Sequence, residues 1–292
     1  MKKYTLLLTV LFVCLPAKHL VPLNWGDVAG VLGADRETAA KIGRLGTLAE
    51  SLKAADNLTP ENEYYIGRAV AADIAGRYTI YQNRALQNYL NKICSTIVIN
   101  SPRPDIYKGY HVAILDTNEI NAFATPGGHI FVTRGLIACA SGEDALASVI
   151  AHEIAHIQLR HALSSIRNSR YMDAALNYSK EELGRSAGEF AAILGDSVNE
   201  IITTMVLDGF SQSQEFDADA AALSLLASAG YQPQGILEML QSLEQKQEGG
   251  KGFGKTHPAP AARITNVNKS IRKYKVNDTR SYRTSRFSTA FR

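Results

Sequence analysis

The chain has 292 residues, of which 46% are hydrophobic and 20% are charged, as is usual for a globular protein with one large domain or two small ones. This composition excludes general disorder. The net charge is only +3 and the lysines and arginines are scattered apart from the last stretch, so the charge gives no support for nucleic-acid binding.

The N-terminus has the pattern of an export signal. Met1-Lys2-Lys3 precede an apolar run from Tyr4 to Pro16, which is short for a membrane span but typical of a secretory signal. We therefore predict a signal peptide over residues 1–20. The alternative is a lipid anchor on Cys14, although Val13 before it is larger than such sites usually allow.

Helices are predicted next. Residues 21–58 form an amphipathic helical segment that we expect to pack on the main body. Thr59 is a suitable N-cap and Pro60 a suitable first residue for a helix, which opens the main domain, predicted over residues 59–275. A second helix is expected over residues 83–99, before two prolines end the helical region.

From Tyr110 the apolar residues alternate as they do in strands. His111 and His129 lie within this pattern and are expected to be surface or packing residues rather than ligands. Pro126-Gly127-Gly128 marks a turn between the last two strands. The predicted strands cover residues 110–116, 120–124 and 129–133, which gives a short sheet just before the next helix.

That helix carries the H-E-x-x-H motif His152-Glu153-Ile154-Ala155-His156. Two histidines four apart lie on one helix face, so both imidazoles can point at one metal ion. Zinc suits two imidazoles plus one more protein ligand, with a fourth position left to water, and Glu153 is placed to take a proton from that water. The other interpretation is a chance spacing in a buried helix, but such polar groups would be costly to bury without partners.

His161 does not extend this motif to a three-histidine site. It follows His152 by nine residues, about half a turn away around the helix, and the glycine that would let the chain bend back is absent. We expect it on the solvent side with Arg160.

The third ligand is expected from a later helix. Glu215 and Asp219 are four apart and share a face, so the first can bind the metal while the second accepts a hydrogen bond from a ligand histidine. Asp217 points elsewhere. Between the two motifs, residues 162–210 have a helical pattern, and the apolar stretch 191–207 is suited to rest on a membrane surface or to cover the active site.

Two further predictions concern the cysteines and the C-terminus. Cys94 and Cys139 are a possible disulfide pair in an oxidising compartment, but their apolar neighbours favour two small buried side chains. The glycine-rich loop 249–254 leads to His257. Residues 276–292 are predicted to be a basic, disordered tail.

In the order of these motifs the chain resembles the M48 family of zinc metallopeptidases, in particular its soluble, exported bacterial members. The resemblance covers roughly residues 60–275. It rests on residues 121–124 with 126–128, on His152-Glu153-x-x-His156, on Glu215 to Asp219, on Ala229-Gly230-Tyr231-x-Pro233, and on Thr256-His257-Pro258 followed by Arg263-Ile264.

The resemblance implies a mostly helical, zincin-like α+β domain with one small sheet next to the H-E-x-x-H helix. One Zn²⁺ is expected on His152, His156 and Glu215. Glu153 is expected to be the general base, and Asp219 is expected to accept a hydrogen bond from a ligand histidine. The strand Asn121-Ala122-Phe123-Ala124 is implied to be an edge against which an extended peptide lies.

His257 is tied to this site only by the family pattern. It is expected to be catalytic, either as an imidazolium that donates to the oxyanion or as a neutral imidazole that occupies zinc's fourth position. The remaining alternative is a loop histidine that caps the following helix.

We therefore expect a zinc metalloendopeptidase of the periplasm that cleaves extended segments of misfolded or unassembled envelope proteins. Unfolded proteins are the expected partners, with possible peripheral association with a membrane. One rival is a chaperone-like or binding protein with a structural or blocked zinc site, which would have no use for Glu153. Another is an exopeptidase, which is disfavoured because no cluster marks a pocket for a substrate terminus.

Overall fold

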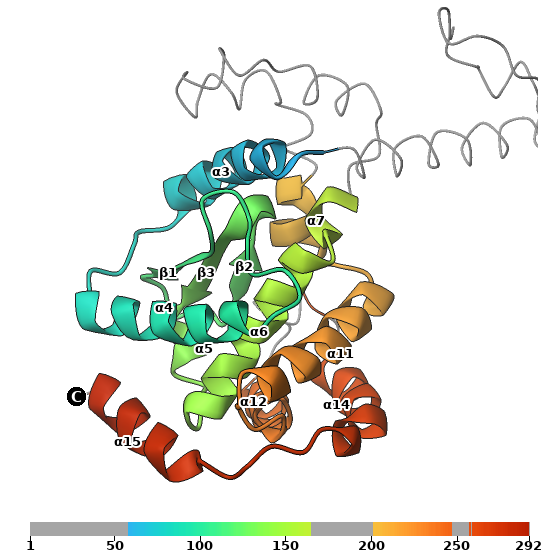
Figure 1. The fold of residues 1–292 in the computed structure, drawn as a ribbon. Coiled ribbons are helices and arrows are strands. Elements are labelled where there is room, and N and C mark those ends of the chain that lie inside the picture. Colours follow the sequence, from blue (N-terminus) through green and yellow to red (C-terminus); the bar gives the residue numbers. More distant parts are fainter. Residues whose placement is uncertain (1–57, 165–200, 247–256, 258, 292) are drawn as a thin grey trace, which may run out of the picture. The chain divides into compact units, whose positions relative to one another are not determined.

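The computed structural model describes residues 58–164, 201–246, 257 and 259–291 (Figure 1). They all belong to one compact unit, Glu50–Arg292. The predicted signal peptide with Cys14, the helical segment up to residue 57 and the glycine-rich loop lie outside the described residues. Within those residues, no helix combines the length and apolar character needed to cross a membrane.

The first two helices begin where the sequence places their caps. Thr59 caps α3 (Pro60–Arg77) by accepting a hydrogen bond of 3.1 Å from the backbone N–H of Asn62. Asn83 caps α4 (Arg84–Ile99) in the same way. Each cap satisfies an N–H group that has no partner inside the helix, so short polar side chains fix both helix starts.

The sheet has three strands, β1 (His111–Leu115), β2 (Ala122–Ala124) and β3 (His129–Thr133), in the order β1-β3-β2. β1 runs parallel to β3 and β2 runs antiparallel to it. β2 is shorter than predicted because side chains replace the ladder at its start. The N–H of Asn121 donates to the Thr133 hydroxyl, and the N–H of Ala122 donates to the Asn121 side chain.

The predicted turn after β2 is the 3₁₀ segment η1 (Pro126–Gly128), on which α3 packs backbone to backbone. A Cβ at Gly67 of α3 would lie 1.6 Å from the carbonyl oxygen of Pro126, and Gly127 has a φ of 70°. Only glycine allows both features, the close approach and the left-handed backbone. This contact holds α3 over the sheet.

Helix α6 (Glu143–Gln158) is the centre of the fold (Figure 1). Every residue from Glu143 to Ile157 is buried, because the sheet, α4 and two later helices pack around it. A helix that is covered on all sides is mostly apolar, so the polar side chains buried in α6 need partners within the protein. The remaining elements before the C-terminal helix are α5 (Arg134–Ile137), α7 (His161–Ser164), the π-helical η3 (Thr203–Asp208), α11 (Gln212–Ser228), α12 (Gln234–Lys246), α14 (Pro260–Ser270) and η4 (Ile271–Lys273).

The fold is therefore mostly helical α+β with one small sheet beside the H-E-x-x-H helix, which confirms the predicted class. The two cysteines agree with the second of the alternatives given for them. Cys94 and Cys139 are buried free thiols, and burial raises the pKa of Cys94 to about 12.

The prediction of a disordered tail is wrong for most of its length, because residues 280–290 form the helix α15 (Arg280–Ala290). Its arginines hold it in place. Arg283 forms an ion pair of 2.8 Å with Asp144, and Arg286 pairs with Glu143. The sequence pattern of a basic Ser/Thr-rich stretch does not reveal that two buried acids at the start of α6 need positive partners.

Candidate metal centre

Four side chains from α6, α11 and the segment before α14 meet in one buried cluster. The Nε2 atoms of His152 and His156 are 3.0 Å apart. Glu215 lies across from them, with carboxylate oxygens 3.4 Å and 3.3 Å from those two nitrogens. His257 completes the group, its Nδ1 being 2.9 Å from Glu215 Oε1. One ligand atom from each residue lies within 4.8 Å of all the others, which is compatible with a single metal ion.

The donor set fits a divalent metal ion. Imidazole nitrogens and a carboxylate oxygen are ligands that zinc favours. One carboxylate oxygen beside these donors, Oε1 of Glu153, is buried and has no hydrogen-bond partner in the described part of the chain. A buried polar oxygen without a partner is costly, so a metal-bound water or a cation in the cluster would stabilise it.

A second layer orients the ligands. Asp219 Oδ1 lies 3.0 Å from Nδ1 of His152, which is the contact expected from the four-residue spacing on α11. The guanidinium of Arg263, from α14, donates to both oxygens of Asp219 at 2.9 Å and 2.6 Å. It also lies 3.2 Å from Glu215. Sequence reasoning assigned Arg263 no role, and its place in the family pattern beside Ile264 was its only signal.

The expectation that His161 lies on the solvent side is wrong. It is buried, and its Nδ1 is 2.9 Å from Nδ1 of His156. The turn that brings it there is made by Arg160, which has a φ of 57°, a conformation rare outside glycine. Arg160 is held in this turn by its ion pair with the buried Glu63 of α3. A glycine was therefore not required for the chain to bend back.

His161 touches the metal cluster without joining it. The cluster of potential ligands contains His152, His156, Glu215 and His257 and leaves His161 out. Because its ring nitrogen meets the ring nitrogen of His156 that faces away from Glu215, it is placed to fix that imidazole. Phe210 stacks on the same ring, with centroids 4.3 Å apart. The two strand histidines, His111 and His129, lie outside the cluster, as expected.

The buried groups of the site differ in the direction in which their pKa values are shifted. Burial raises the pKa of Glu153. Burial alone would also raise the pKa of Glu215. The charges of His257 and Arg263 have the opposite and larger effect, and they hold the pKa of Glu215 well below its usual value. Burial lowers the pKa of His156 to about 3, so this imidazole is neutral. Glu215 is thus an anion and His156 a neutral donor, the forms in which both bind metals.

His152 is under opposing influences. Burial and the charge of Arg263 lower its pKa, whereas hydrogen bonds with Asp219 and Glu215 raise it to about 9. A metal ion would replace the proton on the nitrogen that faces Glu215, while the bond to Asp219 remains.

The strand expected to receive a peptide lies at the edge of the sheet but is covered. Thr133 N–H donates to Asn121 O, and Thr125 N–H to His129 O, so the backbone groups of Ala122 and Ala124 face away from β3. Ala122 and Ala124 are nevertheless 2% and 3% exposed. Phe123 belongs to a buried cluster that includes Ile201 and Ile202, which directly precede η3, and Met205 of η3.

Comparison with known proteins supports a relation to peptidases. A family profile described as "Peptidase family M48" matches residues 82–271 of this chain. The mitochondrial metalloendopeptidase OMA1 of Schizosaccharomyces pombe is 29% identical over 182 residues, which are 61% of this chain and 51% of that protein. The OMA1 of Saccharomyces cerevisiae is 30% identical over 175 residues, 56% of this chain and 47% of that protein.

The beta-barrel assembly-enhancing protease of Escherichia coli K12 is similar over a longer stretch. It is 25% identical over 263 residues, which cover 87% of this chain and 51% of that protein. The chain thus spans about half the length of the curated relatives it matches.

Proposed function

The chain belongs to peptidase family M48, and on that premise we propose that it is a zinc-dependent metalloendopeptidase acting on extended segments of misfolded or unassembled envelope proteins. The observation that carries the proposal is the buried group of His152, His156 and Glu215 with Glu153 beside it. A site that only holds a structural metal has no need of a buried carboxylate with a free oxygen next to the ligands.

His152, His156 and Glu215 are the residues that would hold zinc. The metal would supply Lewis-acid chemistry, which lowers the pKa of water and polarises a peptide carbonyl. Glu153 is the general base in this proposal. Its carboxylate takes the proton of the attacking water and delivers it to the leaving amine nitrogen. Burial raises its pKa, which suits a group that must accept and then release a proton near neutral pH.

The position of His257 supports its second expected role, that of a plug. Its imidazole is within reach of the same point as the three ligands, and so it would fill the fourth position that a water molecule needs. The capping role has less support, because α14 begins with Pro260 and shows no side-chain cap hydrogen bond. We infer that this arrangement is a closed state and that His257 moves away when substrate enters.

The substrate of this proposal is an extended peptide that lies along β2. The backbone groups of Ala124 and the carbonyl of Ala122 point away from β3, as β-augmentation requires, whereas the N–H of Ala122 donates to the Asn121 side chain. Because β2 is buried and η3 is in contact with it, a peptide can pair with this edge only after this cover moves. An unfolded segment can meet this requirement, whereas a folded protein surface cannot present a free strand so readily.

The envelope role rests on the N-terminal pattern and on the names of relatives. Met1 to Pro16 favours export, and one group of relatives is called beta-barrel assembly-enhancing protease. We propose a periplasmic location with unassembled envelope proteins as substrates. Comparing the envelope proteomes of cells with the active enzyme and with its Glu153→Gln variant tests this, since substrates should accumulate in the variant.

A chaperone-like protein with a blocked zinc site is the second candidate, and the position of His257 is the observation that favours it. Hydrolysis of fluorescent casein by the zinc-loaded full chain separates the two. We expect cleavage that falls about 10²-fold or more in Glu153→Gln, at equal zinc content. Glu244→Gln, on an exposed helical position, is the matched control. An unimpaired Glu153→Gln would refute the mechanism, and a parent that never cleaves but suppresses aggregation would favour the rival.

A further inference from the structure

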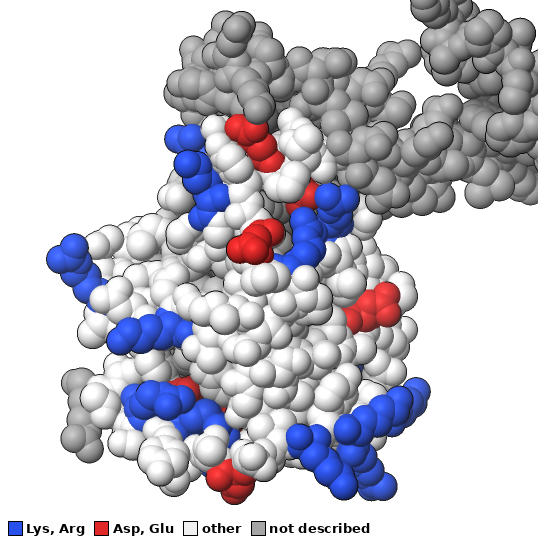
Figure 2. All heavy atoms as spheres, viewed as in Figure 1, with Lys and Arg blue, Asp and Glu red and all other residues white. Residues whose placement is uncertain are grey.

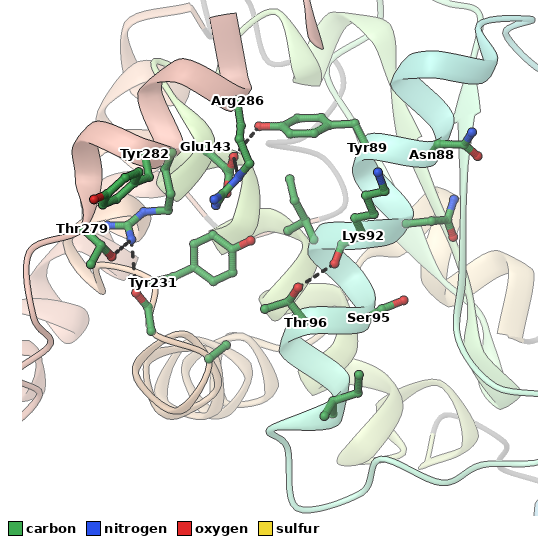
Figure 3. A pocket seen from close by; sticks show the side chains of 16 residues that line it. Asn88, Tyr89, Lys92, Ser95, Thr96, Glu143, Tyr231, Thr279, Tyr282 and Arg286 are labelled. Atoms are coloured by element: carbon green, nitrogen blue, oxygen red, sulfur yellow. Dashed lines mark hydrogen bonds and ion pairs between the residues drawn. The ribbon is translucent and has the colours of Figure 1, made fainter. Parts of the chain in front are cut away.

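A groove lies between α4 and α15, at the end of α6 remote from the metal centre. Its volume is about 960 Å³, within the range of roughly 300–1,000 Å³ that is common for ligand clefts. Figure 3 shows Tyr282 and Arg286 on one side, Tyr89 and Lys92 on the other, and Glu143 between them. In Figure 2, basic side chains gather at the lower left, over α15.

One face of α4 looks into this groove without a partner. Asn88, Lys92, Ser95 and Ile99 follow one another at intervals of four, three and four residues, so they form a single helix face. In the described part of the chain, the side chains of the three polar residues make no hydrogen bond or ion pair. The face therefore offers free donors, acceptors and one positive charge to a ligand.

The acids at the inner end of the groove are already neutralised. Tyr89 donates to Glu143 at 2.9 Å and Arg286 pairs with the same carboxylate. Asp144 has an ion pair of 2.8 Å with Arg283 and accepts a hydrogen bond from a backbone N–H. These pairs cancel two negative and two positive charges, so they leave the groove with no surplus of negative charge.

What remains is positive. Among the described lining residues, Lys92 is exposed and has no counter-ion. Arg283 adds no further charge, because it is buried and paired with Asp144. Lys92 thus supplies one unpaired positive charge that complements a carboxylate.

The rims of the groove are apolar. Ile99 of α4 is 73% exposed and Tyr282 of α15 is 71% exposed, the two highest values among the large hydrophobic side chains of the described residues. They stand on the two sides of the groove, with the ring of Tyr231 in its floor. Tyrosine and arginine around a desolvated hollow are typical of protein-binding surfaces. The ligand should therefore combine apolar side chains with a negative charge.

We propose that this groove binds an extended polypeptide segment that carries acidic and aromatic or aliphatic side chains. A carboxylate of the segment pairs with Lys92, and an apolar side chain packs between Ile99 and Tyr282. Asn88 and Ser95 form hydrogen bonds with the backbone of the segment. The site is separate from the metal cluster, and its binding does not depend on hydrolysis or on the proposed peptidase function.

Fluorescence anisotropy with the full-length Glu153→Gln chain tests the proposal, since this variant should leave the probe intact. The probe is a fluorescein-labelled peptide of about twelve residues that alternates acidic residues with Phe and Leu. A matched peptide has Asn and Gln in place of the acids. We expect the neutral peptide to bind at least about tenfold more weakly, and the acidic one to weaken as salt screens the ion pair.

Variants locate the binding. Lys92→Glu should weaken binding of the acidic peptide by about tenfold or more, and Ile99→Ser by several-fold, because one reverses the charge and the other removes the apolar contact. Lys269→Glu, an exposed lysine on α14, carries the same charge change elsewhere and should stay within twofold. Circular dichroism checks that all variants are folded.

Three results would overturn the proposal. The first is no binding of the acidic peptide by the parent. The second is an equal loss in Lys92→Glu and Lys269→Glu, which would indicate general charge attraction. The third is Lys92-dependent binding to phosphatidylglycerol vesicles without binding to the peptide, which would make the groove a membrane contact.

Discussion

Replacing His257 by alanine should raise the peptidase rate. In the closed arrangement, Nδ1 of His257 lies 2.9 Å from Oε1 of Glu215, and both side chains are buried. A buried hydrogen bond to a charged group contributes about 1.5–3 kcal/mol. If this contact holds the plug in place, its loss changes the ratio of closed to open molecules by roughly 10- to 150-fold. The three expected ligands remain, so zinc content should not fall.

The assay is the initial rate of fluorescent casein cleavage by the zinc-loaded chain, with bound zinc measured on the same preparation. We expect His257→Ala to cleave at least about tenfold faster than the parent, within the range worked out above. His111→Ala, at an exposed strand position outside the cluster, is the matched control. A tenfold fall at full zinc content would refute the plug and favour the oxyanion role. A rate within twofold of the parent would refute both the plug role and the oxyanion role of His257.

Three further outcomes follow from the site and the fold. Metal analysis should find little zinc in Glu215→Ala, whereas Asp219→Ala should bind it only about 10- to 100-fold more weakly; full occupancy in Glu215→Ala would mean that another residue closes the site. His161→Ala should weaken zinc binding in a chelator competition by a similar factor, and His161→Asn should recover part of it, because an amide can still meet the imidazole; equal affinities would contradict a positioning role. Gly67→Ala should destabilise the domain by about 2–3 kcal/mol, since its Cβ would overlap a backbone oxygen of η1, whereas Gly76→Ala in the same helix, with nothing within 4 Å, should be neutral or stabilising. Thermal unfolding by circular dichroism measures both glycine variants, and similar melting temperatures would refute the close-packing argument.

Local rules were enough to predict much of this protein. Thr59 and Asn83 cap their helices because a cap depends only on residues three positions away. The same holds for His152 and His156, which must share a helix face whatever surrounds them. Glu215 and Asp219 share theirs for that reason. Once both motifs lie on helices, bringing them together requires only that α6 and α11 pack side by side, which apolar faces favour.

The tertiary structure alone decided what depends on pairs of distant residues. His161 turns inward because Arg160 takes a left-handed backbone, stabilised by Glu63 nearly a hundred positions earlier. Arg263 reaches Asp219 from another helix. No periodicity encodes such contacts, since each becomes favourable only when two elements are already packed.

The C-terminal helix shows the same limit. By sequence, residues 280–290 are a basic, polar stretch with little apolar surface, and such a segment forms a helix only when something outside it supplies stability. The support comes from Glu143 and Asp144, which α6 buries at its start and which need positive partners there. Sequence therefore determined the capped helices and the metal-binding motifs, which depend on neighbours within one or two turns. Burial decided the rest, because a charge taken out of water must find its partner wherever the fold brings one.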